Sequence, residues 1–147
     1  MIVSFFGHSN YRKNQNDEEK MLEILEQEIG DSTAELYLGG YGNFDAFALS
    51  CAKKYKKKHP TIKIIFVTPY INESYQRSKL QYIQTEYDEI IYPEIETVHP
   101  RLAIKYRNKW IIDKTDTIIF HVTKNYGGAY QAYEYAHKSN KKIIFMQ

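Results

Sequence analysis

Three glycines fall within four residues in the segment Gly39, Gly40, Tyr41 and Gly42, which follows an apolar run and opens a helical pattern. Glycine lets a backbone adopt positive φ and approach a ligand closely. A helix N-terminus then offers N–H groups and the positive end of the helix dipole to an anion. The spacing matches neither the dinucleotide fingerprint nor the phosphate loop. The turn therefore predicts an anion site, with Tyr41 and Asn43 among its ligand contacts, and the alternative is a tight turn without a ligand.

A second pair of glycines, Gly127 and Gly128, again stands between an apolar run and a helical pattern. Asn125 comes shortly before this pair and Ala129 follows it. Two glycine turns after two strands predict two helix N-termini that face one crevice. Together they indicate a phosphate-bearing, nucleotide-like ligand.

A third polar loop follows the first apolar run of the chain. Gly7 allows a sharp turn there, and Ser9 and Arg12 could bind phosphate or sugar. His8 could act as a general base. A solvated surface histidine is the alternative.

Charged and aromatic residues add further candidates. Arg107 would contribute positive charge to the site, or would be a surface charge on a helix. Asp45 would be an N-cap or first-turn anion of its helix, or else a catalytic carboxylate. Tyr70, like Tyr41, could contact a base. The five histidines show no metal-ligand spacing and there is one cysteine, so we expect no metal and no cofactor.

The elements that must position these loops alternate along the whole chain. Six short apolar runs have strand length: Ile2 to Phe6, Ala34 to Leu38, Ile62 to Val67, Glu89 to Tyr92, Thr117 to Val122 and Lys142 to Met146. Most are nearly continuous, which is typical of parallel strands covered on both faces. Helical patterns lie between them: Asp17, as N-cap, to Gly30, Asp45 to Lys58, Tyr75 to Thr85, His99 to Lys114 and Gly127 to Ser139. The order predicts a three-layer α/β fold of Rossmann-like, doubly wound type, mostly parallel, with about six strands and helices on both faces.

Composition limits the class of protein. The 147 residues suit one domain, residues 1–147, and 43% of them are apolar. A net charge of +2 does not indicate a nucleic-acid binder. The single cysteine fits a reducing compartment. With no basic, apolar leader and no long apolar run, we expect a cytoplasmic protein without a membrane partner.

In this order the motifs resemble the SLOG superfamily, the Rossmann-like domain of the LOG phosphoribohydrolases and the Smf/DprA DNA-processing proteins. The resemblance covers roughly residues 2–146 and is nearest to a small, stand-alone bacterial branch. Residues 37–42 and 64–69 are similar to the first glycine motif and its next strand. Arg107, with Asp116, is similar to the arginine-bearing helix, and residues 127–129 to the second glycine motif. The resemblance implies a nucleotide-like ligand, and it implies a homo-oligomer, with Trp110 as an interface candidate.

One departure from the family pattern concerns catalysis. The hydrolase branch carries Pro-Gly-Gly-x-Gly-Thr-x-Glu, and here Gln131 stands where the catalytic glutamate is expected. Because glutamine cannot ionise, the family's hydrolysis is in doubt while the ligand site is retained. We therefore predict a nucleotide or nucleotide-derivative binding protein. The alternatives are an N-glycosidic hydrolase of nucleoside 5′-monophosphates, which needs Asp45, Glu73 or Glu134 to point into the crevice, and a DNA-processing accessory protein.

Overall fold

The structure is a computed structural model that describes residues 1–69, 86–93 and 99–147, so the predicted helix over residues 75–85, Tyr70 and Glu73 lie outside the described residues. The strands are β1 (Ile2–Gly7), β2 (Glu35–Leu38), β3 (Lys63–Val67), β4 (Glu89–Ile91), β5 (Thr117–His121) and β6 (Lys142–Phe145). The helices are α1 (Asp17–Ile29), α2 (Asn43–Lys58), the 3-10 helix η2 (Pro100–Leu102), α5 (Ala103–Lys114) and α6 (Gly128–Lys138). Within the described ranges, no helix is both long enough and apolar enough to cross a membrane.

The strands form one sheet in the order β4-β3-β2-β1-β5-β6. All five pairings between them are parallel. From β1, the strands β2, β3 and β4 follow one another toward one edge of the sheet. The chain then returns to the other side of β1, where β5 and β6 follow toward the opposite edge. The change of direction therefore lies at β1 and β5, where ligands of such sheets are usually found. The predicted doubly wound α/β fold is confirmed.

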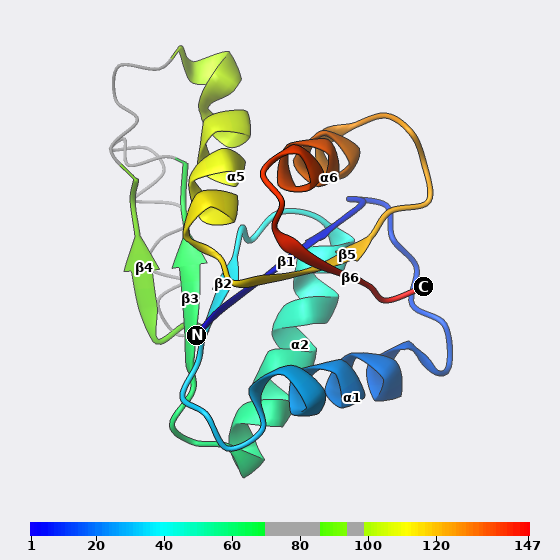
Figure 1. Cartoon of the computed structure of the whole chain (residues 1–147), viewed down its shortest axis with the longest axis vertical. Helices are drawn as coiled ribbons and strands as arrows, with labels where there is room; N and C mark the ends of the chain where they lie inside the picture. The colour runs from blue at the N-terminus through cyan, green and yellow to red at the C-terminus, as the bar shows by residue number, and fades with distance from the viewer. Residues whose placement is uncertain (70–85, 94–98) are drawn as a thin grey trace.

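Helices cover both faces of the sheet, with α1 and α2 on one face and α5 and α6 on the other (Figure 1). Successive side chains of a strand point to opposite faces. Phe5 therefore packs in the core beneath α1 and α2, whereas Phe6 and Phe120 pack beneath α5 and α6. Both faces of β1 are thus buried, which explains its nearly continuous apolar run, interrupted only by Ser4.

The start of α1 differs from the prediction. Asn16, not Asp17, is the N-cap residue, and Asp17 is the first residue of the helix. The Asp17 carboxylate is buried and accepts hydrogen bonds from the Tyr11 hydroxyl (2.5 Å) and the Asn14 N–H (2.9 Å). Asp17 therefore holds the loop after β1 in place. The helix ends, as predicted, at Gly30, whose φ is 53°.

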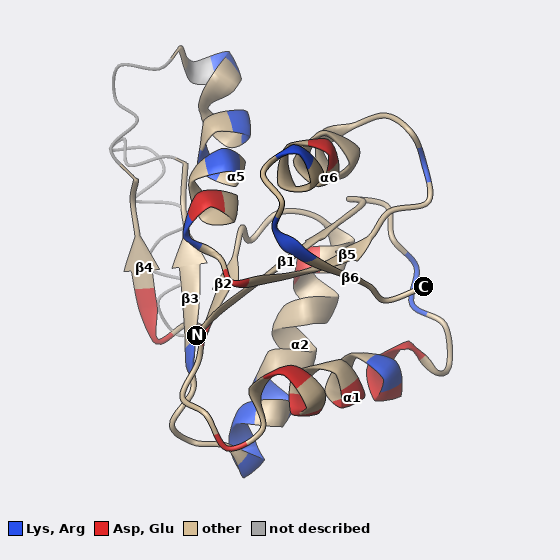
Figure 2. Ribbon diagram, in the orientation of Figure 1, with Lys and Arg blue, Asp and Glu red and all other residues tan. Residues whose placement is uncertain are grey.

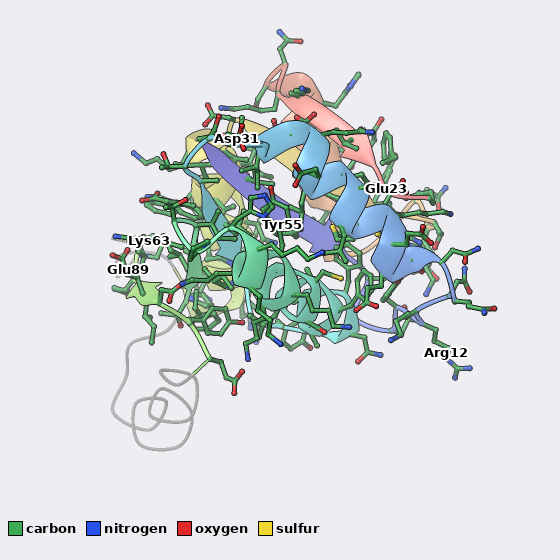
Figure 3. The ribbon with its side chains drawn as sticks, turned by 90° about the horizontal axis from the view of Figure 1, so that it is seen from below. Arg12, Glu23, Asp31, Tyr55, Lys63 and Glu89 are labelled. Carbon is green, nitrogen blue, oxygen red and sulfur yellow. The ribbon has the colours of Figure 1, made fainter. Side chains whose placement is uncertain are left out.

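Several lysines pair with carboxylates of neighbouring elements. Lys63 on β3 and Glu89 on β4 lie side by side, 3.1 Å apart (Figure 3). Lys54 of α2 pairs with Glu18 of α1. Exposed pairs of this kind contribute at most about 1 kcal/mol each. Their main consequence is that much of the positive charge of these lysines is neutralised.

Candidate functional site

A pocket of about 310 Å³ opens where β1, β2 and β5 end. Its walls come from the loops after these strands and from α5, so segments that are far apart in sequence meet there. The lining residues are Phe5, Phe6, Gly7, His8, Ser9, Asn10, Gly39, Tyr41, Asp45, Ile104, Arg107, Asn108, Lys124, Tyr126, Gly127, Gly128 and Ala129. This is the position that the strand order favours for a ligand.

Most of the candidate residues meet at this pocket. Ten of the predicted site residues line it: Gly7, His8, Ser9, Gly39, Tyr41, Asp45, Arg107, Gly127, Gly128 and Ala129. The turn residues Gly40, Gly42, Asn43 and Asn125 are not among the lining residues. Arg12 lines an adjacent cavity, at one edge of the molecule (Figure 3). Glu134 is exposed on α6 and does not line the pocket. Ile104, Asn108 and Lys124 line it and were not predicted as site residues.

The first glycine turn is packed against protein. A Cβ at Gly40, where φ is 66°, would lie 2.0 Å from the Phe66 ring. A Cβ at Gly42, where φ is 90°, would lie 2.7 Å from the Ser9 Cα. The first N–H of α2, that of Asn43, already donates to the Ser9 carbonyl at 2.9 Å. The glycines of this turn are thus explained by close packing, and the turn forms a wall of the pocket.

Arg107 fastens that wall to the sheet. Its side chain is buried on α5, and Nη1 donates to the carbonyl oxygens of Gly39 (2.9 Å) and Val67 (2.8 Å). Nε donates to the Asn108 side chain at 2.9 Å. A Cβ at Gly39 would lie only 3.1 Å from the guanidinium carbon. Arg107 therefore joins the ends of β2 and β3 and places a positive charge at the pocket wall.

Asp45 brings a carboxyl group to the pocket from the first turn of α2. Its Oδ2 accepts a hydrogen bond from the Tyr41 N–H at 2.8 Å. Burial raises the pKa of Asp45 to about 6, against the opposing effects of the Tyr41 N–H and the Arg107 charge. A carboxyl group with this pKa can donate or accept a proton near neutral pH.

His8 connects the loop after β1 to the loop after β5. Its Nε2 accepts hydrogen bonds from the N–H groups of Thr123 (3.0 Å) and Lys124 (3.3 Å). This arrangement requires a neutral ring that carries its proton on Nδ1. Burial lowers the pKa of His8, as do the Lys124 charge and His121, so the neutral form is favoured. Since Nε2 is already occupied as an acceptor, the geometry fits a positioning role for His8 better than a general base.

The second glycine turn is open. Gly127 is the N-cap residue of α6, with φ 93°, and no side chain of the described residues caps this helix. A Cβ at Gly127 or Gly128 would meet no atom of another described segment within 4 Å. Lys124 lines the same pocket as this turn, and its Nζ lies 5.7 Å from the centre of the ring of Tyr126, the residue before Gly127. Helix N–H groups, the helix dipole and a lysine therefore converge on free space, which is the chemistry that binds an anion.

The described part of the chain contains no candidate metal site. Among residues 1–69, 86–93 and 99–147, no group of three or more histidine, cysteine, aspartate or glutamate residues could hold a metal ion.

No protein-family model and no curated protein matches this sequence. Solved structures do match it. DNA processing protein A from Helicobacter pylori, described with a single-stranded DNA binding mode, has a TM-score of 0.65 and 17% identity over 99% of this chain and 64% of its own. Its counterpart from Streptococcus pneumoniae has a TM-score of 0.64 and 14% identity over 97% of this chain and 49% of its own. The chain thus spans less than two thirds of both proteins.

A third match is the molybdenum cofactor binding protein from Rippkaea orientalis, with a TM-score of 0.60 and 16% identity over 98% of this chain and 74% of its own. At these identities the likeness defines the fold. The chain has the Rossmann-like α/β fold of these proteins, so the fold that the sequence resemblance implied is confirmed. One protein of this fold is described as binding single-stranded DNA. We expected from the sequence that nucleic acid is not a partner, and the likeness in fold does not support that expectation.

Proposed function

We propose that this protein binds the phosphate of a nucleotide or nucleotide derivative at the N-terminus of α6. The observation that carries the proposal is the open turn at Gly127 and Gly128. A Cβ placed at either glycine would meet no atom of another described segment within 4 Å, and the turn lines the same pocket as Lys124. Free N–H groups and the helix dipole would hold the phosphate, and Lys124 would add charge.

The rest of the pocket suits the remainder of a nucleotide. Tyr41 and Tyr126 line it and are 67% and 65% exposed, so either ring can stack on a base. Asn108 and Ser9 offer polar contacts to a sugar. A volume of about 310 Å³ lies at the small end of the range for ligand pockets, which supports a compact ligand. A neighbour of the same fold is a molybdenum cofactor binding protein, which supports a small-molecule ligand as a class.

The experiment is a calorimetric titration of a panel of nucleoside 5′-monophosphates into the protein and its Gly128→Asp variant. The new carboxylate would enter the open turn and repel the phosphate, so we expect a loss of affinity of at least about tenfold, or 1.4 kcal/mol. Asn140→Asp is the matched control, because it adds the same charge at an exposed position two residues beyond the last residue of α6. Equal affinities for Gly128→Asp and Asn140→Asp would show that the phosphate does not bind at this turn.

Asp45 favours a second candidate function, the hydrolysis of the N-glycosidic bond of a nucleoside 5′-monophosphate. It is a carboxyl group that lines the pocket, which this reaction requires, whereas Glu134 lies outside. With a pKa of about 6, Asp45 could supply the proton transfer. The test is the release of free base from the same panel. Hydrolysis that disappears in Asp45→Asn, with ligand binding retained, would support this function, and no release with any substrate would contradict it.

A further inference from the structure

A second cavity, of about 210 Å³, lies between α5 and α6. Its lining shares Ile104, Asn108 and Gly128 with the main pocket. The two spaces are therefore adjacent at Gly128, where we place the phosphate. A ligand held at this turn can extend from the main pocket into the groove between the two helices.

Three cations line this groove from one side. Arg101, Lys105 and Lys109 follow one another at every fourth position, a spacing that places them on one face of α5 and its preceding turn. Figure 2 shows the basic residues along α5. No carboxylate of the described residues lines the groove, and none forms an ion pair with these three side chains. Like charges at this spacing repel one another, so the arrangement favours an anion in the groove.

Apart from Asn108 and Gln131, the rest of the lining is apolar or aromatic. Ile112 and Ala132 are 0% and 4% exposed and form part of the lining. Tyr135 of α6 also lines the groove, and its ring is held in place because its hydroxyl donates to Asp113 Oδ1 at 2.6 Å. The Lys109 Nζ lies 5.4 Å from the centre of the same ring. A flat, partly apolar group with a negative charge beside it would match these surfaces.

We infer that the groove binds the second nucleotide unit of a dinucleotide whose first phosphate lies at Gly128. The second base would rest on Ile112, Ala132 and Tyr135, and the second phosphate would face the three cations. The inference rests on the proposed function and deepens it, because it specifies a ligand with two phosphates separated by one nucleoside. A mononucleotide bound at Gly128 would leave the cations of the groove without an anion.

The test compares a 5′-phosphorylated dinucleotide with the matching 5′-mononucleotide by calorimetric titration at one ionic strength. We expect the dinucleotide to bind at least about tenfold more tightly. In the double variant Lys105→Gln/Lys109→Gln this advantage should disappear, while the affinity for the mononucleotide stays the same. Lys57→Gln/Lys58→Gln is the matched control, since it removes the same charge from exposed positions at the end of α2 and should keep the advantage.

Three other results would contradict the inference, and each can be told apart from the others. Equal affinities for the two ligands, or an advantage that survives in Lys105→Gln/Lys109→Gln, would show that the groove does not hold the second unit. The mononucleotide would still bind in that case, and the proposed function would stand. If neither ligand binds, both proposals fail. Affinity that keeps rising with oligonucleotides of four and eight residues would identify single-stranded nucleic acid as the ligand in place of a dinucleotide.

Discussion

Arg107 and Asp45 both bring charge to the pocket, and backbone groups hold both side chains in place. Arg107 donates to the carbonyl oxygens of Gly39 and Val67, and Asp45 accepts the N–H of Tyr41. The first glycine turn is thus held from two sides by side chains of opposite charge. From the sequence, Arg107 was either a surface charge or a site charge, and Asp45 was either an N-cap or first-turn anion of its helix or a catalytic carboxylate. The structure shows that both line the pocket while also bonding the backbone around it.

Removing the Arg107 side chain should destabilise the protein. Arg107→Ala would leave two carbonyl oxygens without their charged donor, and we expect the free energy of unfolding in urea to fall by about 3 kcal/mol. Arg101→Ala, at an exposed position just before the same helix, is the control and should change it by less than about 0.5 kcal/mol. A stable Arg107→Ala variant that only loses ligand affinity would mean that Arg107 serves the ligand and not the fold.

The raised pKa of Asp45 predicts how anion binding depends on pH. Below about 6 the carboxyl group is neutral, and above it a negative charge faces the ligand, so affinity should fall as the pH rises through this value. The stability of the free protein should also decline with rising pH between the ordinary pKa and the raised one, because the folded state retains a proton that the unfolded chain has released. The measurement is titration with a cyclic mononucleotide, whose phosphodiester charge is constant in this range. Asp45→Asn should remove the step, and an identical step in that variant would assign it to another group.

At the scale of elements, two glycine turns that look alike in the sequence differ in their packing. The turn before α2 is filled by the Phe66 ring and by Ser9, whereas the turn before α6 faces open space. No local pattern distinguishes them, because the atoms that fill the first turn come from β3 and from the loop after β1. Tertiary packing therefore decides which helix N-terminus can receive an anion.

This difference predicts opposite effects of the same substitution in the two turns. Gly40→Ala would force a methyl group into the Phe66 ring at a positive φ, and we expect a loss of stability of at least about 2 kcal/mol. Gly128→Ala, in the first turn of α6, should leave stability unchanged or raise it by up to about 1 kcal/mol. Thermal unfolding of both variants gives the comparison. Equal melting temperatures would contradict the packed and open assignments.

Element positions were largely predictable from the sequence, and side-chain contacts were not. Short, nearly continuous apolar runs mark parallel strands, and all six strands were found with ends within one residue of the observed ones. Asp17 was misplaced as an N-cap because its partner, the Tyr11 hydroxyl, depends on the path of a loop. Lys124 and Asn108 were missed for a similar reason. They line the pocket because the fold brings the loop after β5 and helix α5 together there, which no local sequence pattern shows. Trp110, a candidate for a subunit interface, stacks on Tyr37 of its own chain, with ring centres 6.0 Å apart.

For the molecule as a whole, the position of a strand in the sheet determines how many neighbouring strands it pairs with and how deeply it is buried. β1 pairs with β2 and with β5, and both of its faces contribute to the core. β4 and β6 form the edges of the described sheet, and their residues are exposed or only partly buried. Stability should therefore decrease from the centre of the sheet toward its edges.

Hydrogen exchange of the native protein can test this gradient. The amides of β1 and β5 should exchange slowest, because their opening requires the loss of both core layers, and those of β4 and β6 should exchange fastest among the strands. The expected order is the same at all pH values at which the protein is folded. Protection in β6 that equals protection in β1 would indicate that another chain covers this edge, as in the expected homo-oligomer.

The central place of β1 also affects how the chain is made. Val3 pairs with Thr117 and Phe5 with Ile119, so one side of β1 has no partner strand until β5 has been synthesised. A translating ribosome therefore carries a nascent chain whose central strand is only half paired, with one edge of β1 and the Phe6 side chain, which α6 later helps to cover, available to chaperones and to other nascent chains. Release of β5 from the exit tunnel is the event that first allows this protein to close its sheet.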